Sequence, residues 1–175
     1  MNKSLARTIV NRVTQETVTF IETAEETNYE YLLLEVKLPA HGEGPPLHYH
    51  KHFMESFECI EGVLTLLCDK ERVEYKLYPG EGYSVGQRIP HTFFNKESID
   101  LVFRVKLTPP SYFEESIRIH YGLMDDGLAN QKGEPKKLIY TALILTLQNT
   151  RIAGIPIKLQ TMLFNYLVRK SIKNG

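Results

Sequence analysis

Residues 47–62 read LHYHKHFMESFECIEG, and this stretch decides the fold. Side chains two residues apart in a strand project from the same face about 7 Å apart, so His48 and His50 can converge on one metal ion. The four residues after His50 allow the chain to reverse. Glu55 can then return on the neighbouring strand and offer a carboxylate oxygen to the same ion. The spacing therefore predicts a metal site between two strands.

Two more histidines are candidates for this site. A fourth ligand could come from a distant strand, and His91 is the only well-placed candidate further along the β-rich part of the chain. His52 continues the alternation of His48 and His50, so by parity alone it could replace His48 or Glu55 as a ligand. An exposed position in the turn is the alternative for His52.

The sequence around this stretch divides near residue 110 into a β-rich body and a helical tail. Short alternating segments are separated by turn residues such as Glu61-Gly62 and Pro79-Gly80. Many short strands without intervening helices are typical of an antiparallel sandwich or barrel. Strands are expected over residues 17–23, 31–38, 47–50, 55–60, 63–68, 73–77, 83–86, 91–95 and 99–107.

Three helices are expected after the two prolines that end the β-rich body. Ser111 and Glu114 have the spacing of a capping box, which predicts the start of the first helix. Pro135 is expected in the first turn of the second helix, a position that proline favours. The predicted helices cover residues 111–126, 135–148 and 154–173.

The fixed positions of the stretch also match a known motif. The pattern G-x5-H-x-H-x3,4-E-x6-G is filled by Gly42, His48, His50, Glu55 and Gly62. This is the first motif of the cupin superfamily, so the chain resembles a cupin.

The second cupin motif, G-x5-P-x-G-x2-H-x3-N, is matched in part. Gly80, His91 and Asn95 fill its positions, whereas Gly86 stands where proline is usual and Arg88 where glycine is usual. The metal position is retained and the loop before it differs. The resemblance extends over roughly residues 15–108 and does not include the helical tail.

The resemblance implies a mainly β protein with an antiparallel jelly-roll barrel. The barrel would occupy residues 1–110, with its motifs at 42–62 and 80–95, and residues 111–175 would form a helical extension packed on the barrel or on a partner subunit. One divalent metal would be bound inside the barrel, and the family register places His52 in the turn. Fe, Mn, Ni, Cu and Zn all suit such a site. The implied ligands are His48, His50, Glu55 and His91.

Four further residues are candidates for a substrate pocket. Phe57 and Cys59 share the parity of Glu55, so they should face the barrel interior, where each could line a pocket or fill the core. An apolar setting raises a thiol pKa, which argues against Cys59 as a nucleophile. Arg88 and Arg104 could orient an anionic substrate near the metal, and surface placement is the alternative for both.

Composition excludes several classes of protein. Lys+Arg and Asp+Glu are equal at 21 each, which argues against a generally basic nucleic-acid binder. The N-terminal residues lack the apolar run of a secretory signal, and the two cysteines lie in apolar segments, so we expect a cytoplasmic location with reduced thiols. No segment is long and apolar enough to predict a transmembrane helix.

The net charge of zero conceals two unequal parts. After Glu134 there are seven basic residues and no acidic ones, so the first 135 residues carry a net charge of −7. The third predicted helix is amphipathic and basic, which would allow it to lie on an anionic membrane surface. We prefer docking onto the acidic barrel or within a homodimer. The apolar stripe of this helix comprises Leu159, Met162, Leu163, Tyr166 and Leu167.

Three classes of function remain open, because a fold supports many reactions. The first is a metal-dependent enzyme, for example a dioxygenase, that acts on a small molecule at open coordination positions of the ion. The second is a binding protein or sensor that uses the same pocket without turnover. The third is a structural or membrane-surface module that depends on the basic tail.

Overall fold

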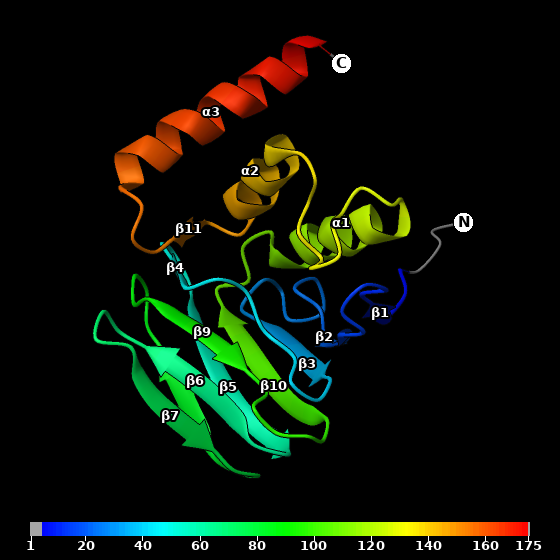
Figure 1. Cartoon of the computed structure of the whole chain (residues 1–175), viewed down its shortest axis with the longest axis vertical. Coiled ribbons are helices and arrows are strands. Elements are labelled where there is room, and N and C mark those ends of the chain that lie inside the picture. The colour runs from blue at the N-terminus through cyan, green and yellow to red at the C-terminus, as the bar shows by residue number, and fades with distance from the viewer. Residues whose placement is uncertain (1–4, 175) are drawn as a thin grey trace.

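The protein consists of two facing antiparallel sheets with helices at one end (Figure 1). The computed structural model describes residues 5–174, with the side chains of Val168 and residues 171–174 left out. The larger sheet has the strand order β1 (Thr8–Val10), β2 (Thr17–Glu22), β3 (Leu32–Leu38), β10 (Leu101–Thr108), β5 (Met54–Glu61) and β8 (Gly82–Val85). The smaller sheet has the order β11 (Thr150–Ile152), β4 (His48–His50), β9 (His91–Phe94), β6 (Leu64–Cys68) and β7 (Val73–Leu77).

All nine predicted strands are present, with ends within two residues of those expected. They form because apolar residues alternate with polar ones, so that one face of each strand can be buried. β10 pairs antiparallel with both β3 and β5 and holds the larger sheet together. The interior between the sheets contains rings such as Phe57 and Phe103, whose centroids lie 6.2 Å apart.

Two short strands were not predicted. β1 extends the larger sheet by pairing with β2, and β11 extends the smaller sheet by pairing with β4. Thr150 lies opposite His50 and Ile152 lies opposite His48. The C-terminal extension is therefore not only helical, because it adds a strand to the sheet that carries both histidines.

The three predicted helices are present as α1 (Phe113–Asp125), α2 (Leu138–Leu147) and α3 (Ile157–Asn174). They are stacked at one end of the barrel, with α1 and α2 nearer to the strands and α3 outermost (Figure 1). Gln160 attaches the start of α3 to the smaller sheet, since its side-chain amide exchanges two hydrogen bonds of 2.9 Å with the backbone of Ile152.

The predicted capping box at the start of α1 is wrong. Tyr112 is the residue that precedes the helix, and no side chain caps its first turn. The Ser111 hydroxyl instead donates to the carbonyl of Leu147 at 3.5 Å and accepts from the Asn149 amide at 2.8 Å. Glu114 forms a salt bridge with Arg118. Contacts with the end of α2 thus replace the local contact that the spacing predicted.

Pro135 does not begin the second helix. It lies opposite Ala129 in an isolated antiparallel bridge. Around it the amide of Lys136 donates to the carbonyl of Leu128, and the amide of Asn130 donates to the carbonyl of Glu134, both at 2.8 Å. These two hydrogen bonds keep the backbone extended, so α2 begins only at Leu138.

The buried face of α3 is not the stripe expected from the sequence. Phe164 is buried, whereas Leu159, Met162 and Tyr166 are exposed. Burial of Gln160 at the start of the helix explains this orientation, because its bonds to Ile152 fix the helix rotation. Within the described part of the chain, no helix combines the length and the apolar character needed to cross a bilayer.

Candidate metal centre

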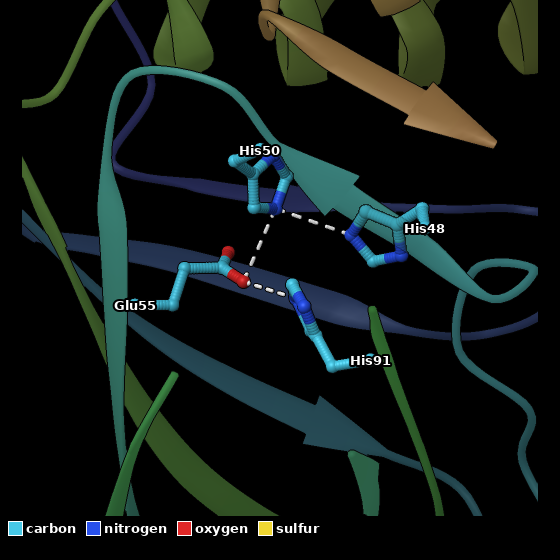
Figure 2. A group of neighbouring side chains, drawn as sticks. All are labelled: His48, His50, Glu55 and His91. Carbon is cyan, nitrogen blue, oxygen red and sulfur yellow. Dashed lines mark hydrogen bonds and ion pairs between the residues drawn. The ribbon is translucent and has the colours of Figure 1, made fainter. Parts of the chain in front are cut away.

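Four side chains from both sheets meet inside the barrel (Figure 2). His48 and His50 point inward from β4 because they share one parity of the strand. His91 on β9 is the register partner of His48, so the pairing of the two strands brings it to the same place. Glu55 reaches the group from β5 in the facing sheet. The expected association of these four residues is therefore present in the structure.

The potential ligand atoms converge closely. All lie within 4.8 Å of one another, and all four residues are buried. Nε2 of His50 lies 3.1 Å from Nε2 of His48 and 3.2 Å from Oε2 of Glu55. Nε2 of His91 lies 2.7 Å from the same carboxylate oxygen. Three imidazole nitrogens and one carboxylate oxygen form a donor set that suits first-row divalent metals.

The outer nitrogens of two histidines are held by backbone carbonyls. Nδ1 of His48 donates to the carbonyl of Pro46 at 3.0 Å, and Nδ1 of His91 donates to the carbonyl of Ile89 at 3.0 Å. A proton on Nδ1 leaves the Nε2 lone pair free, and this lone pair faces the interior of the group. Such outer contacts fix the orientation and tautomer of metal-binding histidines.

His50 receives the equivalent contact from the C-terminal extension. The Thr150 hydroxyl lies 2.9 Å from Nδ1 of His50 and 3.2 Å from the carbonyl of Gln148. Since a hydroxyl has one proton, donation to Gln148 leaves the oxygen to accept from His50. The role of Thr150 was not predicted from the sequence. The only signal was the β-branched pair Thr150 and Ile152, which is too short to predict a strand between two helices.

Replacing Thr150 with valine should weaken metal binding. Valine keeps the shape and strand preference of threonine but removes the hydroxyl that accepts from His50. Loss of such an outer contact lowers metal affinity by about 10–100-fold. Competition with a chromophoric chelator measures the change, and Thr19→Val on the distant strand β2 is the matched control. Unchanged affinity in Thr150→Val would contradict this role.

The surroundings also set the protonation of the group. Burial, followed by the nearby His91 and His50 rings, lowers the pKa of His48 well below its usual range. Burial opposes ionisation of Glu55, but His50 and His91 outweigh it and hold the carboxyl pKa well below its usual range. Burial opposes protonation of His91, but the Glu55 carboxylate outweighs it and raises the pKa of His91. Metal ions bind neutral imidazoles and ionised carboxylates, so an ion would displace the proton that His91 shares with Glu55. The residues present therefore fit a divalent metal.

Phe57 and Cys59 face the interior, as their parity predicted. The Phe57 ring lies near the metal group, with its centroid 6.3 Å from that of His91. Cys59 is fully buried further along β5, and burial raises the pKa of its thiol. Two other rings flank His50. The Phe53 ring is stacked on the His50 ring with 4.0 Å between their centroids, and the centroid of the Phe113 ring, on α1, lies 6.4 Å from that of His50. These two aromatic neighbours were not predicted.

The two candidate arginines lie outside the barrel interior. Arg104 projects from the outer face of β10 and forms a salt bridge of 3.1 Å with Glu35. Arg88 is exposed in the loop before β9, where its amide donates to the carbonyl of His50 at 2.7 Å. His52 is exposed in the turn between β4 and β5 and is not a member of the group. Strand parity places Arg104 outward, so its assignment to an interior substrate pocket is not supported.

Comparison with known sequences agrees with the fold and the site. Residues 34–105 match the cupin domain family, and this segment contains all four residues of the group. No curated protein is significantly similar to the chain.

Solved structures of low sequence identity match part of the chain, and one of them has a TM-score above 0.5. A predicted oxalate decarboxylase from Thermotoga maritima is 17% identical, with a TM-score of 0.51, over 58% of this chain and 90% of that chain. A sugar phosphate isomerase from a cupin superfamily, from Silicibacter pomeroyi, is 21% identical with a TM-score of 0.47. The latter match covers 55% of this chain and 60% of that chain, so less than two thirds of that protein is matched.

Residues 34–105 therefore resemble a cupin domain, and the fold of the chain agrees with that likeness. Its fold is a mainly β jelly-roll barrel formed by two antiparallel sheets, followed by three helices. Inside the barrel, His48, His50, Glu55 and His91 are positioned for metal binding.

Proposed function

We propose that the protein is a metal-dependent enzyme that acts on a small molecule, with chemistry of the oxygenase type. The observation that supports this most is the convergence of three Nε2 atoms and one carboxylate oxygen in a buried site. Fe, Mn, Ni, Cu and Zn are all compatible with these ligands. A bound ion would act as a Lewis acid with coordination positions open to a substrate.

The protein's own residues would orient the ligands and exclude water. His48, His50 and His91 are buried, and each has its Nδ1 atom held by an outer partner. The ligand atoms therefore need little rearrangement when an ion binds. Burial also strengthens electrostatic interactions within the site, because bulk water is excluded.

A non-catalytic binding protein or sensor is the second candidate. The rings of Phe53, Phe57 and Phe113 lie near the histidines, and none of them can transfer a proton. Such surroundings suit retention of an apolar ligand as well as they suit catalysis. The two candidates differ in turnover, not in metal binding.

Oxygen consumption distinguishes the two candidates. Protein loaded with Fe(II) is mixed with small aromatic compounds and organic acids, and an oxygenase consumes oxygen only when its substrate is present. His91→Ala should abolish that consumption, because it removes a metal ligand. Binding of a compound without oxygen consumption or product would instead support the sensor, and activity that persists in His91→Ala would exclude this site as its source.

A further inference from the structure

A hollow of about 710 Å³ lies outside the barrel, on the outward face of β4. Its walls come from β4, from the loops that precede β7 and β9, and from the start of α3. Figure 1 shows β4, β11 and the beginning of α3 at this end of the barrel. Four of its ten lining residues are cationic and none is acidic. We call it the basic hollow; its cations are Lys51, Lys70, Arg72 and Arg88.

A fifth cation is buried beside the basic hollow. Arg151 is the register partner of Tyr49, which lines the hollow, and it precedes Ala153, which also lines it. Its side chain is 5% exposed, and its Nε atom is buried without a hydrogen-bond partner among the described residues. Nη1 donates to the carbonyl of Thr150 at 2.7 Å, which leaves the positive charge without a carboxylate.

The cations at the basic hollow have no ion-pair partner among the described residues, although Arg151 lies over the ring of Phe164, 5.3 Å from its centroid. Over residues 5–174, none of these five cations forms a salt bridge with a carboxylate. The positive charges of Arg151 and Arg88 both lie near Lys51. Like charges held together in this way favour the binding of an anion.

The start of α3 adds to the positive electrostatic potential of the basic hollow. Ile157, its first residue, lines the basic hollow, and the first turn of this 18-residue helix contains no acidic residue. Free amide groups at a helix N-terminus carry a partial positive charge, which stabilises anions. Backbone dipole and side-chain charges therefore act in the same direction.

We propose that the basic hollow binds a soluble, phosphate-bearing small molecule. Its volume falls within the range of about 300–1,000 Å³ that is typical of small-molecule sites, so it can hold more than a bare ion. Guanidinium groups such as that of Arg88 bind phosphate oxygens in a bidentate manner, and lysines add charge. The site is separate from the metal group, because Tyr49 lines it from the outward face of β4, and Lys51 lines it directly after this strand, whereas His48 and His50 point inward.

Calorimetric titration of the full-length protein with inorganic pyrophosphate at low ionic strength tests this proposal. The wild-type protein should bind pyrophosphate, and Lys51→Met and Arg88→Gln should each weaken binding by about tenfold, because each removes a charge-assisted hydrogen bond. Lys132→Met, which removes an exposed lysine outside the hollow, is the matched control and should bind as the wild type does. Thermal unfolding verifies that every variant is folded.

Three results would overturn the proposal. The first is no pyrophosphate binding at millimolar concentration, and the second is equal affinity of Lys51→Met, Arg88→Gln and the wild type. The third comes from sedimentation with vesicles of equal parts phosphatidylcholine and phosphatidylserine. If the wild type binds these vesicles but not pyrophosphate, and the two variants lose vesicle binding, the same cations recognise lipid headgroups.

Discussion

Metal-free protein should become more stable by about 4 kcal/mol when Mn²⁺ is added at about 1,000 times its dissociation constant. The increase is expected because the four ligands are brought together only by folding: β4 and β9 belong to one sheet and Glu55 to the other. Glu55→Gln should lose most of this increase, because the amide keeps the size of the side chain but removes the charged ligand. Denaturant unfolding with and without Mn²⁺ measures both quantities.

Glu58→Gln is the matched control for this experiment. Glu58 lies on the same strand as Glu55 but on its exposed face. The control should therefore gain as much stability from Mn²⁺ as the wild type. An equal gain in Glu55→Gln would contradict the assignment of Glu55 as a ligand.

Asn95→Ala should lower the free energy of unfolding by about 3 kcal/mol. The Asn95 side chain is buried, and its amide nitrogen donates to the carbonyls of Leu38, Pro39 and Ile99 at 3.3, 3.0 and 2.7 Å. Its oxygen accepts from the amide of Glu97 at 3.0 Å. Alanine leaves these backbone groups without their partner, which costs more than the loss of an exposed hydrogen bond.

Asn130→Ala provides the comparison for Asn95→Ala. The side-chain oxygen of Asn130 also accepts hydrogen bonds within a loop, from the backbone amides of Lys132 and Glu134. Unlike Asn95, Asn130 is exposed to solvent. Water can replace its hydrogen bonds, so the expected loss is about 1 kcal/mol or less. Denaturant unfolding of both variants tests the difference. If Asn95→Ala costs no more than Asn130→Ala, the Asn95 network is not important for stability.

The convergence of His48, His50, Glu55 and His91 was predicted from the sequence because strand geometry determines most of it. Alternation in β4 requires His48 and His50 to share a face. Glu55 was expected on the neighbouring strand, but β5 belongs to the facing sheet, from which its carboxylate still reaches His50 at 3.2 Å. His91 depends on a long-range pairing; its position in the β-rich body made it a candidate, and the second motif then marked it as an implied ligand. The structure explains that match, because His91 is the register partner of His48.

The contacts that the C-terminal extension makes with the rest of the protein could not be predicted from local sequence patterns. Thr150 belongs to a three-residue strand, and its contact with His50 spans 100 positions in the sequence. Ser111 has the spacing of a helix cap, but its hydroxyl bonds to the end of α2 instead. Both side chains satisfy distant partners that only the folded chain brings close. The positions of Arg88 and Arg104 were likewise left open, since they depend on a loop and on the outer face of a sheet.

Elemental analysis of the purified protein beside His48→Ala and His91→Ala tests the metal centre most directly. The two histidines come from adjacent strands and converge with His50 and Glu55 on one buried point. The predicted result is about one equivalent of a first-row transition metal in the wild-type protein and almost none in either variant. An intact metal content in both folded variants would contradict the proposed site.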